Sequence, residues 1–126
     1  MKRSWIGFAL LVLLLGLSIL VTVVMTRIHE PIEACLLQAA DFARQENWLR
    51  AQQYFREAEA GWTKWNHIRA CFADHNPVEE IDAAFAMLRV YGTAREEQAF
   101  AGGCSDLAKK VAAVGEAHAF VWWNLL

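Results

Sequence analysis

The sequence lacks the short motifs that mark most enzyme active sites. It has no nucleophile elbow, no phosphate-binding glycine loop, no HExxH and no paired CxxC, each of which sets reactive groups at a fixed spacing. An active site assembled from His75, Glu79 and Asp82 is the remaining enzymatic hypothesis, and no motif supports it. We therefore predict that the chain is not an enzyme.

Cysteine and proline are scarce as well. Three cysteines, Cys35, Cys71 and Cys104, are too few for a disulfide scaffold, and their odd number leaves at least one thiol free. Helical spacing keeps them further apart than the ~7 Å between Cα atoms that a disulfide tolerates, so we predict no intramolecular disulfide. Two prolines and abundant alanine, without any low-complexity tract, favour an ordered all-α domain.

The chain also lacks an excess of positive charge. Nine Lys or Arg and fourteen Asp or Glu follow His29, which gives this part a net charge of −5. Proteins that bind nucleic acids or anionic lipid surfaces do so through clustered cations. We therefore predict that nucleic acid is not a partner and that the chain has no polybasic lipid site.

What the chain does contain is one long apolar run. Arg3 and Arg27 bound it, and no charged residue lies between them. A helix over Ser4–Ile28 exceeds the ~20 residues needed to cross a bilayer, whereas a secretory signal has a shorter core and a small-residue cleavage site. We predict an uncleaved N-terminal membrane anchor, residues 1–29, followed by one helical domain, residues 30–126.

Charges on either side of the run predict its orientation. Lys2, Arg3 and the amino terminus precede the run, whereas acidic residues offset the positive ones that follow it. Positive residues remain on the cytoplasmic side of a membrane. We therefore predict a single-pass protein of the cell membrane, with its N-terminus in the cytoplasm and its helical domain extracytoplasmic.

Apolar residues after the run repeat at spacings of three and four, which is typical of amphipathic helices. A first helix is predicted to open at Pro31, because proline suits the first helical position. The break at Gln45-Glu46-Asn47 ends it, with Asn47 as the N-cap of the next helix. The strongest stripe then continues through one predicted helix: Trp48, Ala51, Phe55, Ala58, Trp62, Trp65, Ile68, Phe72 and His75.

Proline and glycine delimit the later helices. Asn76 as N-cap and Pro77 at the first helical position predict the start of a third helix. Gly102-Gly103 is predicted to end it, and a fourth helix follows. Alanine-rich helices joined by short turns predict an antiparallel four-helix bundle after the transmembrane helix.

Two resemblances add to this prediction. Small and aromatic residues stand at the spacings of a tetratricopeptide hairpin: Ala39, Phe42, Trp48, Ala51, Phe55 and Ala58. This segment resembles one such repeat, which implies two closely packed helices (a TPR-like hairpin) and no peptide-binding residues, because a free-standing array normally needs three repeats.

The second resemblance extends over the whole chain. The anchor is followed by an Ala/Trp-rich hairpin, by His75 before Glu79-Glu80-Ile81-Asp82, and by His118 before Asn124-Leu125-Leu126. This outline resembles an uncharacterised domain-of-unknown-function family of small single-anchor bacterial membrane proteins, of the spore-forming Firmicutes type. The resemblance implies a helical fold and a membrane location, and it supplies no catalytic residues.

One group of residues has the spacing of metal ligands. His67, Cys71 and His75 follow one another at intervals of four, so on one helix either neighbouring pair shares a face and could bind a soft metal ion or sense redox state. His118 is predicted to lie level with His67, which allows a cluster with Cys71. The structural interpretation, a buried cysteine with non-ligating histidines, is the one that we prefer. We predict no bound cofactor.

The tryptophans are candidates for contacts beyond the domain. Trp62 and Trp65 lie on the aromatic stripe, and Trp122 and Trp123 lie in an apolar C-terminal end that could pack in the core, meet the membrane interface or form a patch for a partner. The function predicted is a membrane-anchored helical interaction module, an accessory or adaptor subunit that docks on another membrane or envelope protein. The alternative is a metal- or redox-responsive sensor that uses Cys71.

Overall fold

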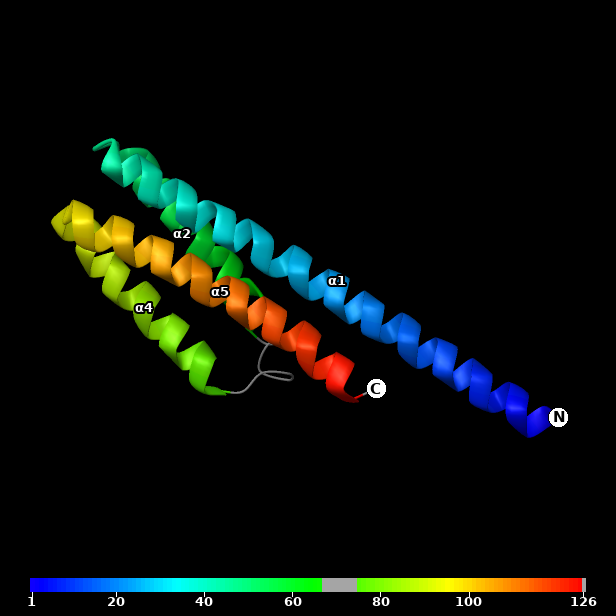
Figure 1. Ribbon diagram of the computed structural model, residues 1–126. Coiled ribbons are helices and arrows are strands. Elements are labelled where there is room, and N and C mark those ends of the chain that lie inside the picture. Colours follow the sequence, from blue (N-terminus) through cyan, green and yellow to red (C-terminus); the bar gives the residue numbers. More distant parts are fainter. Residues whose placement is uncertain (67–74, 126) are drawn as a thin grey trace.

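The computed structural model describes residues 1–66 and 75–125, with side chains for 1–66 and 78–115, and this part is helical without strands. Four helices follow one another: α1 (Lys2–Arg44), α2 (Trp48–Lys64), α4 (His75–Ala94) and α5 (Glu97–Leu125). The second half of α1 lies beside the other three helices, whereas its first half extends beyond them (Figure 1). The predicted all-α class is confirmed at this level.

α1 is one uninterrupted helix with Pro31 in its interior, so the prediction that a new helix opens at Pro31 is wrong. Proline inside a helix removes one backbone hydrogen bond and crowds the preceding turn. Burial of this turn offsets that cost, because Ile28, His29 and Ile32 are at most 8% exposed. Tertiary packing thus overrides a local helix-breaking signal.

Two glycines bring neighbouring helices close to α1 at this turn. A Cβ atom on Gly61 of α2 would lie 3.2 Å from Cγ1 of Ile32, and one on Gly115 of α5 would lie 3.3 Å from Cβ of His29. Both distances are shorter than ordinary van der Waals contact. The missing side chains therefore let α2 and α5 pack on the same turn of α1.

α2 begins where the sequence predicts. The side-chain oxygen of Asn47 accepts a hydrogen bond from the backbone N–H of Arg50 at 3.4 Å, which is the predicted N-cap interaction. Glu46, in the preceding turn, has a φ of 61°. Within α2 the predicted stripe is confirmed by the buried residues Ala51, Phe55, Ala58 and Trp62.

α2 ends earlier than predicted. Its last residue is Lys64, with Trp65 as the C-cap, and His75 is the first residue of α4. The prediction of one helix from 48 to 75 is therefore wrong, and Asn76 lies within the first turn of α4 instead of capping it. Apolar residues spaced by three and four do not show that a single helix is uninterrupted, because two successive helices can have the same spacing.

α4 and α5 are joined at Arg95, and not at Gly102-Gly103 as predicted. Arg95 adopts a left-handed φ of 55°, and both glycines lie inside α5, so the predicted break is wrong. A Cβ atom on Gly103 would overlap Cδ2 of Leu88 in α4. The absence of a side chain at Gly103 thus allows α4 and α5 to pack closely.

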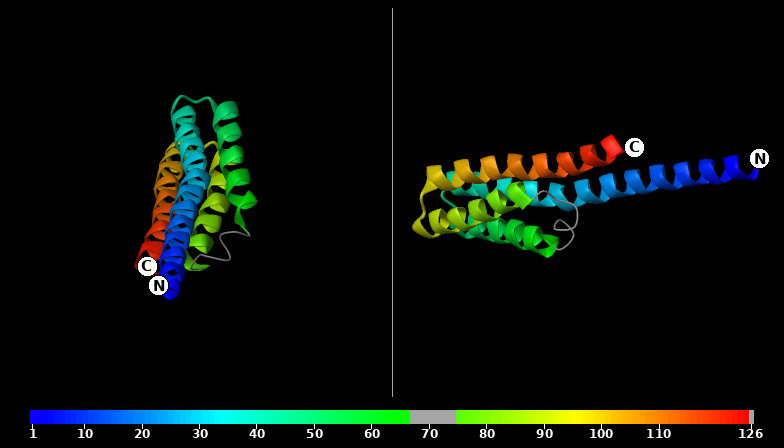
Figure 2. Two further views of the ribbon diagram at one scale, coloured as in Figure 1. Left: turned by 90° about the vertical axis from the view of Figure 1, so that its right-hand side faces the viewer. Right: turned by 90° about the horizontal axis from the view of Figure 1, so that it is seen from below.

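The core lies between the second half of α1 and the other three helices. Its large members come from all four: Leu36, Phe55, Trp62, Ile81, Phe85, Leu88, Phe100, Leu107 and Val111. α5 runs antiparallel to α1, and α2 and α4 lie together on one side of the pair that α1 and α5 form (Figure 2). α1 packs most extensively against α5 and then against α2, whereas α2 and α4 make few contacts with each other.

The first half of α1 exposes its apolar side chains. Trp5 is 76% exposed and Leu13 is 66% exposed, whereas a core helix of a soluble protein would bury such residues. Among the described helices, α1 is the one that is long and apolar enough to cross a membrane. By length and composition it fits a membrane anchor or a signal sequence.

We predict opposite effects on stability for alanine at the two adjacent glycines of α5. At Gly103 the added methyl group meets the buried Leu88, and such overpacking destabilises the fold by ~1–3 kcal/mol. This cost exceeds the stabilisation that alanine provides through its higher helix propensity. Nothing lies within 4 Å of a Cβ atom at Gly102, so Gly102→Ala stabilises by ~0.5–1 kcal/mol. Thermal unfolding of the full chain in detergent, followed by circular dichroism, checks both variants. Equal shifts in Tm would contradict the close approach.

Candidate functional site

His29 lies where the exposed half of α1 passes into the core. Its side chain is buried, with 3% of the residue exposed, and its Nδ1 lies 2.7 Å from the carbonyl oxygen of Met25. Because a carbonyl oxygen can only accept, Nδ1 donates this hydrogen bond. The bond holds the imidazole along α1, where Gly115 of α5 packs against it.

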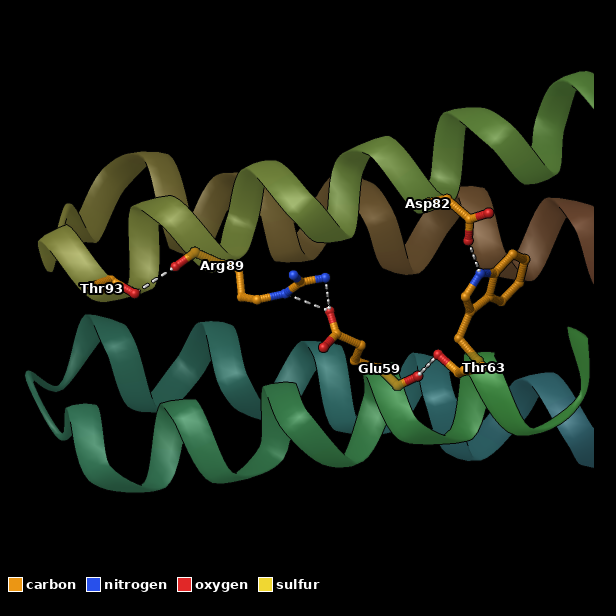
Figure 3. A network of polar contacts seen from close by, with 6 residues as sticks. Glu59, Thr63, Asp82, Arg89 and Thr93 are labelled. Carbon is orange, nitrogen blue, oxygen red and sulfur yellow. Dashed lines mark hydrogen bonds and ion pairs between the residues drawn. The ribbon is translucent and has the colours of Figure 1, made fainter.

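His29 contacts Trp62, one of the tryptophans predicted to meet a partner or the membrane. The two ring centroids lie 6.1 Å apart in an edge-on arrangement. Trp62 is only 2% exposed, so the structure places it in the core. Its Nε1–H donates a hydrogen bond of 2.7 Å to Oδ1 of Asp82 (Figure 3). A line of contacts through His29, Trp62 and Asp82 therefore joins α1, α2 and α4.

A second polar link joins α2 and α4. Arg89 donates a hydrogen bond from Nε to Oε2 of Glu59 at 3.0 Å, and its Nη2 lies 2.9 Å from the same oxygen in an ion pair (Figure 3). The Arg89 side chain is 62% exposed, and ion pairs at such sites contribute up to ~1 kcal/mol. The two links join α2 and α4, which make few other contacts with each other.

Two cavities open beside these contacts. One, of about 220 Å³, lies between α1 and α5 and is lined by Thr26, His29, Glu30, Glu33, Ala112 and Gly115. The other, of about 400 Å³, lies mainly between α2 and α4 and is lined by Gln52, Phe55, Arg56, Glu59, Leu88, Arg89, Gly92, Thr93 and Phe100. Only the second reaches the ~300–1,000 Å³ of small-molecule sites. Its single acidic residue, Glu59, is already bound by Arg89.

The two described cysteines are free thiols, as predicted for them. Burial raises the pKa of Cys104 to about 12, although the nearby Arg44 guanidinium acts in the opposite direction. Burial also raises the pKa of Cys35, and so does the Glu57 carboxylate, which accepts a hydrogen bond from its Sγ at 3.8 Å. Because metal binding and redox chemistry need the thiolate, neither thiol is suited to them at neutral pH.

The predicted metal ligands are not brought together by the described residues. His67 and Cys71 lie outside these residues, and the helix predicted to carry them ends at Lys64. His75 begins α4 and His118 lies in α5, and their side chains are outside the described set. In the ranges with described side chains, no three His, Cys, Asp or Glu could hold a metal ion. The metal site stays a prediction.

The other predicted tryptophans lie at two helix ends. Trp65 is half-buried at the C-cap of α2. Trp122 and Trp123 belong to the last turns of α5, and their side chains are outside the described set. The backbone of this end of α5 runs beside the apolar half of α1 (Figures 1 and 2).

Three residues at the contact of α2 and α5 with α1 were not predicted from the sequence: His29, Gly61 and Gly115. A signal for His29 exists, because Met25, His29, Ile32 and Leu36 continue the core stripe at spacings of three and four. No local signal pairs either glycine with α1, since these contacts join helices that are distant in the sequence.

The cysteine environments predict slow thiol chemistry at Cys104. We expect iodoacetamide at pH 8 to modify Cys35 faster than Cys104 in the folded chain, and both equally after unfolding, as measured by mass spectrometry of the peptides. Because the pKa of Cys104 rises from 9.0 to about 12 on folding, its contribution to stability is complete below pH 9 and is lost as the pH rises toward 12. Rapid modification of Cys104 would contradict its burial.

The link between Trp62 and Asp82 predicts a stability effect. Asp82→Ala removes the acceptor of a buried indole N–H, and we expect a loss of ~1–2 kcal/mol in the free energy of unfolding. Asp106→Ala, at an exposed position of α5, is the matched control and should change stability by less than ~0.5 kcal/mol. Denaturant unfolding in detergent measures both, and equal effects would argue against the link.

Residues 19–125 match the family model described as Domain of unknown function (DUF4363). The match begins inside the apolar run and extends through all four helices. The chain matches no curated protein and no solved structure. The predicted resemblance is thus confirmed at the level of an uncharacterised domain family.

Proposed function

We propose, for a chain that belongs to the family described as Domain of unknown function (DUF4363), that it is a membrane-anchored helical interaction module. The first half of α1 crosses the cell membrane once, with the N-terminus in the cytoplasm. The rest of the chain stands on the extracytoplasmic surface, as an accessory or adaptor subunit of another membrane or envelope protein. The observation that carries this proposal is the continuity of α1, which is apolar and exposed in one half and central to the core in the other.

The extent of the family match favours an anchor over a cleaved signal. The match begins at residue 19, within the apolar run, and Met25 and Ile28 near the end of this run are buried. Cleavage after the run would remove residues that contribute to the packing of the domain. It would also cut the helix just before the turn on which α2 and α5 pack.

The continuity of α1 also supports a particular orientation of the domain relative to the membrane. In this proposal the domain is an antiparallel four-helix bundle, whose first hairpin, the end of α1 with α2, is the TPR-like one. Its helices run roughly along α1 (Figure 1), and therefore stand upright on the membrane. A rigid upright domain presents its sides to neighbouring membrane proteins, as an adaptor requires.

The end of α5 brings a further contact to the membrane surface. Gly115 packs against His29, and α5 continues to Leu125, ~15 Å further along the antiparallel α1. Trp122 and Trp123 therefore reach the level of the headgroups, where amphipathic aromatic rings are favoured. The bacterial, Firmicutes-type origin stays a prediction from the resemblance.

The proposal predicts that the full chain stays in the membrane pellet after an alkaline carbonate wash. Leu11→Arg combined with Leu15→Arg should release it, because each arginine at the centre of a membrane helix costs ~2.5–3.5 kcal/mol. Leu49→Arg, at an 83% exposed leucine of α2, is the control and should leave the chain in the pellet. A wild-type chain that is shortened or found in the supernatant would contradict the anchor.

Orientation and partner are tested on the same membranes. Protease added to protoplasts with an intact cell membrane should digest the domain and leave an N-terminal epitope tag intact. Crosslinking in native membranes, followed by mass spectrometry, should recover a membrane or envelope protein bound to the chain. Purification in mild detergent that yields the chain alone and monomeric would remove the basis of the adaptor role.

A further inference from the structure

Two polar links frame the cavity of about 400 Å³ between α2 and α4. Gln52 donates a hydrogen bond of 3.3 Å from Nε2 to the backbone oxygen of Gly92. About two turns further along α2, the Glu59 carboxylate and the Arg89 guanidinium face each other (Figure 3). Arg56 lies between these links on the same side of α2 and also lines the cavity. The cavity is therefore held between two points where α2 and α4 are joined.

The cavity carries an excess of positive charge, although the chain after His29 is acidic overall. Arg56 and Arg89 line it together with one acidic residue, Glu59, which leaves a single net positive charge. In the part of the chain with described side chains, Arg89 pairs with Glu59, whereas Arg56 forms no ion pair. The Nε and Nη2 atoms of Arg89 both lie at Oε2 of Glu59. Because a guanidinium has five N–H donors, Arg89 keeps donors for a second acceptor.

Apolar side chains close the inner side of the cavity. Phe55, Leu88 and Phe100 line it and belong to the core, and each is at most 4% exposed. The rings of Phe55 and Phe100 lie 5.6 Å apart in an edge-on arrangement, so this wall is aromatic. A cavity with cations near the solvent and an apolar wall toward the core suits a molecule with one charged end and an apolar body.

We propose that this cavity binds a small carboxylic acid, with its carboxylate held by Arg56 and Arg89 and its apolar body against the aromatic wall. Guanidinium groups bind carboxylates through charge-assisted hydrogen bonds, and Arg89 already holds the carboxylate of Glu59 in this way. A ligand with one negative charge balances the net charge of the cavity. A phosphate group carries up to about two, and the excess would be repelled by Glu59.

Such a ligand would join the two helices that make few contacts with each other. Arg56 belongs to α2 and Arg89 to α4, so one carboxylate between them adds a link across this side of the domain. Because the site exists only in the folded chain, binding stabilises the fold by mass action. This role goes beyond that of an adaptor and does not depend on the membrane anchor.

Titration of the full chain in detergent with hydrocinnamate and with hexanoate, an aromatic and an aliphatic acid of this class, tests the proposal. We expect saturable binding in isothermal titration calorimetry and a Tm that rises with the concentration of the acid. Arg56→Gln should weaken the affinity at least ~tenfold, because it removes a charged donor. Glu59→Gln should strengthen it, since it frees the donors of Arg89. Arg44→Gln, which removes an exposed arginine paired with Asp41, is the matched control and should keep the wild-type affinity.

Each outcome supports the site or overturns it. Weaker binding by Arg56→Gln and tighter binding by Glu59→Gln, with Arg44→Gln unchanged and all three variants folded by circular dichroism, support it. Equal binding of the uncharged hydrocinnamide, or tighter binding of inorganic phosphate, overturns the choice of a carboxylic acid. No saturable binding of either acid, or equal losses with Arg56→Gln and Arg44→Gln, overturns the site. None of these results bears on the anchor, which the carbonate wash tests separately.

Discussion

Two glycine-bearing helices pack on one turn of α1, and the rest of the structure depends on this contact. Gly61 lets α2 approach Ile32, and Gly115 lets α5 approach His29. The buried side chains of this turn hold the helix straight through Pro31. The apolar half and the core half of α1 therefore form one continuous rod, and whatever position the apolar half takes also orients the domain.

The opposite side of the domain is held differently. α2 and α4 make few contacts with each other and are joined by polar links, from Trp62 to Asp82 and from Arg89 to Glu59. The exposed ion pair of Arg89 and Glu59 contributes little free energy compared with buried apolar packing. The domain thus has a tightly packed side at α1 and α5 and a more weakly joined side at α2 and α4.

The two described cysteines are poorly suited to thiol chemistry at neutral pH. The thiols of Cys35 and Cys104 have raised pKa values because they are buried, which keeps them protonated at neutral pH. Apolar side chains are exposed along the first half of α1 and, in α4, at Met87 and Val90. Such surfaces are costly in water, so each needs either lipid or protein against it.

Features that depend on local chemistry and periodicity could be predicted from the amino-acid sequence. The apolar run, the cap at Asn47 and the stripe through Phe55 and Trp62 all follow from the identity and spacing of neighbouring residues. The resemblance to an uncharacterised family could likewise be predicted from the outline of the chain.

Features that depend on contacts between residues distant in the sequence could not be predicted, because they arise from the packing of the helices. Gly102-Gly103 has the composition of a turn, yet Leu88 in another helix makes Gly103 a point of close packing. Pro31 has the composition of a helix start, yet its neighbours in α1 are buried by α2 and α5. Trp62 is a large aromatic residue that suits a surface contact equally well, until His29 and Asp82 enclose it. A residue type limits the conformations that are possible, and the packing of other helices selects among them.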